Sequence, residues 1–233
     1  MIAENLKILR DRIVDISNKV QRDPAEIKII AVSKNFGINE ISEAVNAGVT
    51  DFGENKAQEL DSKFAQLGNK MIWHFLGHLQ RNKVRFVVNS ADYIHSVDSL
   101  MIAMDINNRA QKINKVQKIL LQVKTSDEET KSGLTDESEI MDIAWYCKEL
   151  KNVELNGLMT IGPATDDREA IRRSFRYMNN LRDSLKADGL HIKELSMGMT
   201  NDYDIAIEEG ATMLRIGTAI FGERIYSNIT DEQ

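Results

Sequence analysis

The strongest constraint on the fold is a regular alternation between short, β-branched apolar runs and longer segments with helical periodicity. Eight apolar runs begin near residues 27, 49, 71, 92, 115, 153, 192 and 211, and a helical segment separates each run from the next. Strand-helix alternation in a chain of about 250 residues indicates a parallel sheet closed into a (β/α)8 TIM barrel. An open, doubly wound sheet is the alternative that the same alternation permits.

A further amphipathic segment precedes the first run. Apolar residues recur at helical spacing over residues 1–20, at Ile2, Leu6, Leu9, Ile13, Ile16 and Val20. We expect this extra N-terminal helix to cap the bottom of the barrel. The chain has only two prolines and no Gly/Ser-rich stretch that would read as a linker. Residues 1–233 are therefore expected to form a single α/β domain.

Composition excludes several classes of function. A net charge of −6 and a pI near 5.4 do not fit the basic patch that nucleic-acid binding requires. The only cysteine, Cys147, lies in an apolar-periodic stretch where a packing role is expected. We find no signal-peptide h-region and no run near the ~20 apolar residues of a membrane span. We therefore expect a cytoplasmic protein that does not bind membranes.

A lysine follows the first apolar run and carries the main chemical signal. The run Ile29–Val32 leads through Ser33 into Lys34. Burying an unpaired ammonium is costly, so Lys34 either bends out to solvent or is held inside for its chemistry. In a barrel the active site lies at the C-terminal ends of the strands, where Lys34 is expected. A desolvated lysine can become a neutral amine and attack a carbonyl.

The ends of the last two predicted strands favour an anion. Ser196, Gly198 and Thr200 precede a short helix, while Gly217 and Thr218 follow the final strand. Hydroxyl and backbone N–H groups in these two loops are a frequent phosphate site in barrels. An ordinary helix cap and a strand-end turn would have the same composition.

Arg215 lies in this otherwise apolar last strand. It faces either a surface carboxylate or a bound ligand, because a guanidinium cannot shed its charge. A lysine at the C-terminal ends of the barrel strands, opposite a phosphate site, suggests a ligand that is a phosphorylated aldehyde or ketone, held as a Schiff base. From the residues alone, a sugar-phosphate aldolase and a pyridoxal 5′-phosphate (PLP) protein both remain open.

The histidines add less to the chemistry. His74 and His78 are four residues apart on a strand and its end, with an intervening Gly77 and no zincin glutamate. No metal site is expected, since the single cysteine lends no support. We expect packing or surface roles for His95 and His191.

Six segments resemble those of the pyridoxal phosphate homeostasis protein family. They are "AVSK", "FGEN", "WHFLGHLQRNK", "SDEETKSG", "GLMTIG" and "LSMGMTNDYDIAIEEGATMLRIGTAIFGER", in order from residue 31 to 224. The resemblance implies a single barrel of the fold-type III PLP proteins, similar to the N-terminal domain of alanine racemase. It departs slightly from the family pattern at Thr200 and at residues 35–37.

The resemblance also implies a cofactor and its contacts. Lys34 would carry PLP as a Schiff base, and Arg215 would face the pyridine nitrogen. Asn55 and His78 would lie in the same pocket. The residues implied to surround the phosphate are Ser196, Met197, Gly198, Met199, Gly217 and Thr218.

A carrier is the first hypothesis for what the bound cofactor does. An arginine at the pyridine nitrogen cannot accept its proton, which weakens the electron sink that PLP catalysis uses. Racemisation also needs a second base; Tyr226, in the short tail after Gly222, is a formal candidate, although surface packing is expected there. We therefore predict a protein that binds PLP, buffers it and delivers it to apo-enzymes, and that has no established catalytic reaction of its own. We expect this protein to be a monomer. A PLP-dependent racemase and a sugar-phosphate aldolase are the alternatives.

Overall fold

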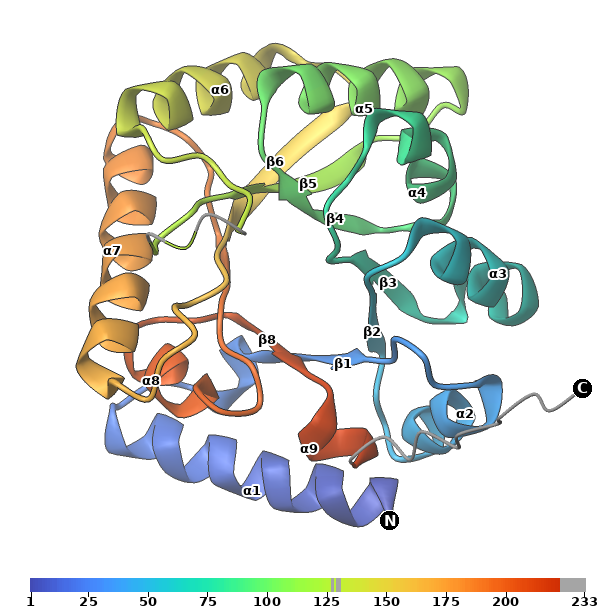
Figure 1. Ribbon diagram of the computed structural model, residues 1–233, viewed down its shortest axis with the longest axis vertical. Helices are drawn as coiled ribbons and strands as arrows, with labels where there is room; N and C mark the ends of the chain where they lie inside the picture. Colours follow the sequence, from blue (N-terminus) through green and yellow to red (C-terminus); the bar gives the residue numbers. More distant parts are fainter. Residues whose placement is uncertain (127, 129–130, 223–233) are drawn as a thin grey trace, which may run out of the picture.

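The computed structural model describes residues 1–126, 128 and 131–222 as a closed barrel of parallel strands (Figure 1). The strand order follows the sequence, and the last strand pairs with the first, so that Ile30 lies opposite Arg215. The strands are β1 (Lys28–Val32), β2 (Asp51–Glu54), β3 (Ile72–Phe75), β4 (Tyr93–Val97), β5 (Gln117–Gln122), β6 (Val153–Met159), β7 (Glu194–Ser196) and β8 (Met213–Ile216). The predicted (β/α)8 fold is confirmed, and the open-sheet alternative is wrong.

The helices surround this barrel. They are α1 (Ile2–Lys19), α2 (Ile38–Asn46), α3 (Ala57–Leu67), α4 (Val84–Ser90), α5 (Leu100–Lys112), α6 (Glu137–Glu149), α7 (Arg168–Ala187), α8 (Tyr203–Glu208) and α9 (Thr218–Phe221). Short 3-10 turns occur at η1 (Pro24–Glu26), η2 (Gly68–Lys70) and η3 (Arg81–Lys83).

The N-terminal helix forms as expected but does not cap the bottom of the barrel. Helix α1 lies in the outer ring, against α2, α8 and α9 (Figure 1). Leu6, Leu9 and Ile13 form its buried face. The cause lies after β8, where the predicted strand over residues 211–222 ends at Ile216 and turns into the four-residue α9. So short a helix leaves apolar surface exposed, and α1 covers it.

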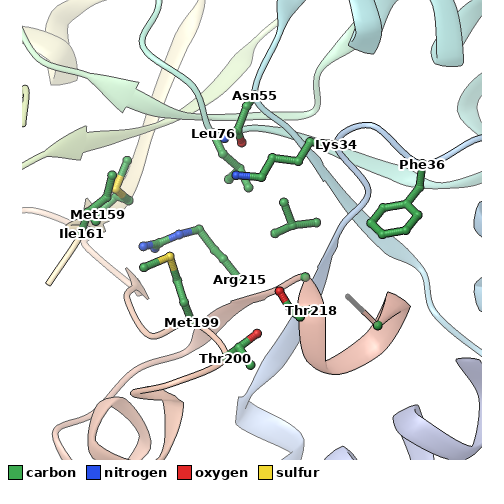
Figure 2. A pocket seen from close by; sticks show the side chains of 13 residues that line it. Lys34, Phe36, Asn55, Leu76, Met159, Ile161, Met199, Thr200, Arg215 and Thr218 are labelled. Carbon is green, nitrogen blue, oxygen red and sulfur yellow. The ribbon is translucent and has the colours of Figure 1, made fainter. Parts of the chain in front are cut away.

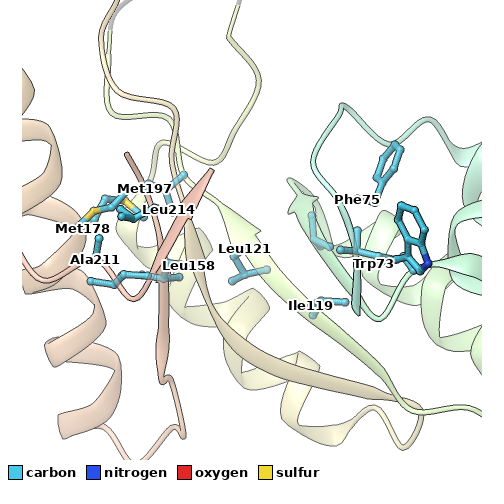
Figure 3. Close-up of a cluster of buried hydrophobic side chains, with 14 of the residues drawn as sticks. Trp73, Phe75, Ile119, Leu121, Leu158, Met178, Met197, Ala211 and Leu214 are labelled. Carbon is cyan, nitrogen blue, oxygen red and sulfur yellow. The ribbon is translucent and has the colours of Figure 1, made fainter. Parts of the chain in front are cut away.

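Two apolar layers hold the barrel together. The larger one fills the space between sheet and helices, where Trp73, Phe75 and Leu214 are buried (Figure 3). A smaller cluster of Ile30, Leu120, Met159 and Met213 lies apart from it. Cys147 is buried, and burial raises the pKa of its thiol to about 12, in agreement with the expected packing role. Within the described residues, no helix combines the length and apolar character of a bilayer crossing.

Candidate functional site

A cavity of about 260 Å³ lies at the C-terminal ends of the barrel strands (Figure 2). This volume is near the lower end of small-molecule pockets, which span roughly 300–1,000 Å³, and suits a one-ring ligand. Its polar lining consists of Lys34, Asn55, Thr200, Arg215 and Thr218, and its larger apolar lining of Val32, Phe36, Leu76, Met159, Ile161 and Met199. The backbone of Gly217 and Gly222 completes it.

Lys34 extends into this cavity from the end of β1 (Figure 2). Its side chain is half-buried. In the part of the chain that the structure describes, its ammonium has no hydrogen-bond acceptor or ion-pair partner. Lysines that serve structure are normally paired where they are shielded from water. The sequence-based alternative of a lysine bent fully into solvent is therefore wrong.

The backbone on both sides of Lys34 is clamped by a buried lysine on α3. Lys63, only 6% exposed, donates to the Ser33 carbonyl oxygen at 2.8 Å and to Glu59 Oε1 at 2.8 Å. Glu59 Oε1 in turn accepts the Asn35 backbone N–H at 2.6 Å. Asn35 has a φ of 64°, in the left-handed region that side chains rarely adopt. The clamp therefore stabilises the turn that aims Lys34.

Glu54, at the end of β2, completes this cluster. Its Oε1 accepts both the Lys63 ammonium and the Ser33 hydroxyl at 2.6 Å. The carboxyl group is 0% exposed, and burial raises its pKa although Lys63 and Ser33 oppose the shift. Its Oε2 has no hydrogen-bond partner among the described residues. Lys63 is thus the cation that makes a buried Glu54 carboxylate tolerable.

Gly77 allows the next wall of the cavity to approach. A Cβ at this position would lie 2.0 Å from the Asn55 carbonyl oxygen, so only glycine fits. The close approach brings Leu76 and Asn55 to the cavity together. The "FGEN" and "WHFLGH" segments therefore act as one unit of the wall.

Arg215 faces the cavity from β8 (Figure 2). It is only 5% exposed, donates to Ser196 Oγ at 2.7 Å and to the Thr160 carbonyl oxygen at 2.8 Å. Burial lowers its pKa to about 10, and the charge of Asp202 opposes that shift. Arg215 still carries its proton at neutral pH. Among the described residues it forms no ion pair, so a buried positive charge borders the cavity.

Hydroxyl groups border the cavity beside β7 and β8. Thr200 and Thr218 lie near one another there (Figure 2), and Thr200 Oγ1 accepts the Ala219 backbone N–H at 3.4 Å. Gly198, with a φ of 92°, lets the loop after β7 fold back against β8, where its carbonyl oxygen accepts the Arg215 N–H. Donors for an anion therefore lie on the loops where the sequence predicts a phosphate.

The structure brings six of the ten predicted contact residues to the cavity lining: Lys34, Asn55, Met199, Arg215, Gly217 and Thr218. The other four lie elsewhere. Ser196 is buried beneath Arg215, and Gly198 forms the turn behind it. Met197 packs in the outer apolar layer beside Leu214 (Figure 3). His78 is exposed, and its Nδ1 lies 3.4 Å from Asp98 Oδ2. Tyr226 lies outside the described residues.

Two histidines lie in the barrel interior, outside the lining of the cavity. His74 and His95 are fully buried and hydrogen-bonded to each other at 2.9 Å. The spacing of two between Tyr93 and His95 could have indicated that these two polar residues share one face of their strand. Over the described residues, no group of three His, Cys, Asp or Glu side chains could hold a metal ion.

Residues 5–225 match the family described as alanine racemase, N-terminal domain. A relative from Aquifex aeolicus (strain VF5), named pyridoxal phosphate homeostasis protein, is 40% identical over 96% of this chain and 99% of its own. A relative of the same name from Escherichia coli (strain K12) is 41% identical over 97% of this chain and 98% of its own. PipY of Synechococcus elongatus PCC7942, solved with PLP bound, is 35% identical with a TM-score of 0.83, covering 95% of this chain and 100% of PipY.

Proposed function

The chain belongs to the pyridoxal phosphate homeostasis protein family, and from that premise we propose that it binds PLP in the cavity at the barrel mouth. The observation that carries the proposal is that Lys34 and Arg215 both line one small cavity. The residues fit the cofactor: an amine for its aldehyde, a cation for its pyridine nitrogen, and hydroxyls for its phosphate. Through this binding the protein takes part in PLP homeostasis.

Lys34 is the residue proposed to hold the cofactor covalently, as a Schiff base. Bound PLP supplies an aldehyde that condenses with amines and a ring that accepts electrons. The Lys34 amine has no competing partner in the described structure, and the Lys63 clamp fixes the turn from which it extends. Covalent attachment keeps a reactive aldehyde from other amines in the cell.

An arginine at position 215 favours a protein that carries PLP over an enzyme that uses PLP in catalysis. Electron withdrawal by the ring is strongest when a carboxylate keeps the pyridine nitrogen protonated, whereas a guanidinium donates and cannot take up that proton. Racemisation needs a second base opposite the lysine. Among the described lining residues, only Lys34 and Arg215 carry titratable groups. We therefore propose a carrier that delivers PLP to apo-enzymes, with an amino-acid racemase as the alternative.

Amino-acid turnover separates these two proposals. The PLP-loaded protein is incubated with individual L-amino acids, and D-isomers are measured by chiral chromatography. The carrier proposal expects no D-isomer beyond the amount of protein present. Product in excess of that amount would establish the racemase instead. Delivery is measured by transfer to an apo-enzyme in the presence of a trap for free PLP.

Thr218 is proposed to bind the phosphate group. Replacing Thr218 by valine keeps the shape and removes the hydroxyl, so PLP binding is expected to weaken about tenfold, since a hydrogen bond to a charged group contributes at least roughly 1.5 kcal/mol. Fluorescence titration with PLP and with pyridoxal, which lacks the phosphate, measures the effect. Pyridoxal affinity should stay unchanged; an equal loss for both ligands would contradict the assignment.

The domain and oligomeric predictions extend the proposal. We propose that residues 1–233 act as one domain and that the protein is a monomer, since the lining from one barrel already supplies an amine, a guanidinium and hydroxyl groups for the cofactor. Light scattering coupled to size-exclusion chromatography measures the mass in solution. A dimer mass at micromolar concentration would contradict the monomer.

A further inference from the structure

Five buried side chains form a continuous hydrogen-bonded line through the barrel interior, from the cavity to the bottom. They belong to five different strands: Arg215 on β8, Ser196 on β7, His95 on β4, His74 on β3 and Asp51 on β2. The distances are 2.7 Å from Arg215 to Ser196 Oγ, 2.9 Å from Ser196 Oγ to His95 Nδ1, 2.9 Å from His95 Nε2 to His74 Nδ1, and 2.9 Å from His74 Nε2 to Asp51 Oδ1. We call this line the interior relay.

Asp51, at one end of the interior relay, determines which nitrogen of His74 carries a proton. Burial acts to raise the pKa of Asp51, but hydrogen bonds from His74 and Thr50 outweigh it and hold the pKa below its usual value. Asp51 is therefore an acceptor at both oxygens. His74 must then carry a proton on Nε2 to make its bond to Oδ1.

Arg215, at the other end of the interior relay, determines the direction in which the remaining hydrogen bonds are donated. A guanidinium only donates, so Ser196 Oγ accepts from Arg215. His95 is neutral, because burial lowers its pKa well below the usual range and the charge of Arg215 lowers it further. If His95 donated to Ser196 as well, the serine proton would find no acceptor in the described structure. Ser196 therefore donates to His95 Nδ1, and His95 donates through Nε2 to His74.

We propose that Asp51 is a positioning residue for Arg215, coupled to it by four hydrogen bonds that are all donated in one direction. Each link can be satisfied in only one way once the two ends are fixed. The Asp51 carboxylate thereby acts as the remote counter-charge of a guanidinium with which it makes no contact. Low polarity around such a chain strengthens each bond.

The surroundings shield the interior relay from solvent and pack against the His74 ring. The ring of Tyr93 stacks on His74 with centroids 4.8 Å apart and an interplanar angle of 6°. Lys28 and Lys118 approach the Tyr93 ring, and Lys28 pairs with Glu194 at 2.7 Å. Ser196 and both histidines are 0% exposed. Lys28 thus has an ion-pair partner outside the relay, and its charge also helps to lower the pKa of Asp51.

The consequence for the cofactor rests on the proposed function. Arg215 donates one hydrogen bond to Ser196 Oγ and one to the Thr160 carbonyl oxygen. These two bonds fix the plane of its guanidinium group. A locked guanidinium presents its remaining donors to the cavity at one angle. The interior relay therefore sets how Arg215 meets the pyridine nitrogen, although Asp51 never touches the ligand.

Nitrogen-15 NMR of the protein without PLP tests the interior relay directly. The expected result is that His74 and His95 are both neutral with the proton on Nε2, and that Arg215 Nη protons give separate, slowly exchanging signals. A proton on Nδ1 of either neutral ring, or a charged His95, would overturn the proposal. This measurement needs no variant and no cofactor.

Variants of Asp51 test its reach to Arg215. Asp51→Ala is expected to abolish the single-tautomer signals and to average the Arg215 Nη signals. Asp51→Asn, which can still accept through Oδ1, should preserve both. Asp61→Ala, at an aspartate that binds Ser90 outside the barrel, is the matched control and should change neither. Unchanged histidine and Arg215 signals in a folded Asp51→Ala protein would overturn the proposal.

PLP titration then connects the interior relay to the site. Asp51→Ala is expected to weaken PLP binding about threefold to thirtyfold, the range seen for residues that act through others. Asp51→Asn should lose less affinity than Asp51→Ala. Equal affinity in native protein and Asp51→Ala would overturn the link to Arg215. If the native protein shows the relay but binds no PLP, the proposed function fails while the relay stands.

Discussion

Replacing Lys34 by alanine is expected to abolish the long-wavelength absorbance of PLP bound to the protein and to weaken binding at least ~100-fold. The alanine removes the amine that forms the Schiff base and leaves only the contacts of the phosphate and the ring. Absorbance spectra during PLP titration measure both quantities. The loss should exceed that of Thr218→Val, because a covalent link is broken.

Two variants separate the amine of Lys34 from its charge. Lys34→Arg keeps a cation in the cavity but cannot form the Schiff base, so it should also lack the long-wavelength band. Lys56→Ala, at an exposed lysine next to Asn55, should retain the native spectrum. A native-like band in Lys34→Ala would remove Lys34 from its proposed role.

Replacing Lys63 by methionine is expected to destabilise the protein by about 3–5 kcal/mol, the usual loss when one partner of a buried ion pair is removed. Methionine fills a similar volume but leaves Glu54 buried without its cation. It also releases the Ser33 carbonyl oxygen and Glu59 from the clamp. Urea unfolding at pH 7 measures the change, with Lys70→Met, an exposed lysine, as a control expected within about 0.5 kcal/mol.

The pH dependence identifies Glu54 as the cause of that loss. Burial raises the pKa of Glu54 above its unfolded value, so the folded state binds the proton more tightly. Stability from such a group is present at low pH and is lost as the pH rises through the folded pKa. The loss in Lys63→Met should therefore shrink when unfolding is measured at acidic pH, and Glu54→Gln combined with Lys63→Met should recover part of it. A loss independent of pH would contradict this explanation.

Periodicity predicted most of the barrel because its strands and helices differ in length and pattern. It failed after Ile216, where "TAIF" is an apolar run that reads equally as strand or helix. Only the packing of this segment, whose Ala219 N–H bonds to Thr200, decides between them. The position of α1 follows from the same short helix and was equally hidden from local pattern.

The site was predictable where a residue ends a strand, and less so beyond the strand. Lys34, Arg215 and Thr218 reach the cavity because strand ends meet at the barrel mouth. Residues 196–199 were predicted as one group, yet alternation sends Ser196 inward and Met197 to the outer layer. The interior relay joins five strands, and the Lys63 clamp joins α3 to β2 and to the turn after β1; of these contacts, only the Glu59–Lys63 pair, four residues apart on α3, follows from local spacing.

Borohydride reduction of the PLP-loaded protein, followed by peptide mapping, tests the central claim most directly. Reduction converts the Schiff base into a stable secondary amine on the lysine that formed it. The label is expected on the peptide that contains Lys34, at one PLP per chain. A label on a peptide that contains another lysine and not Lys34 would contradict the assignment of the cavity as the PLP site.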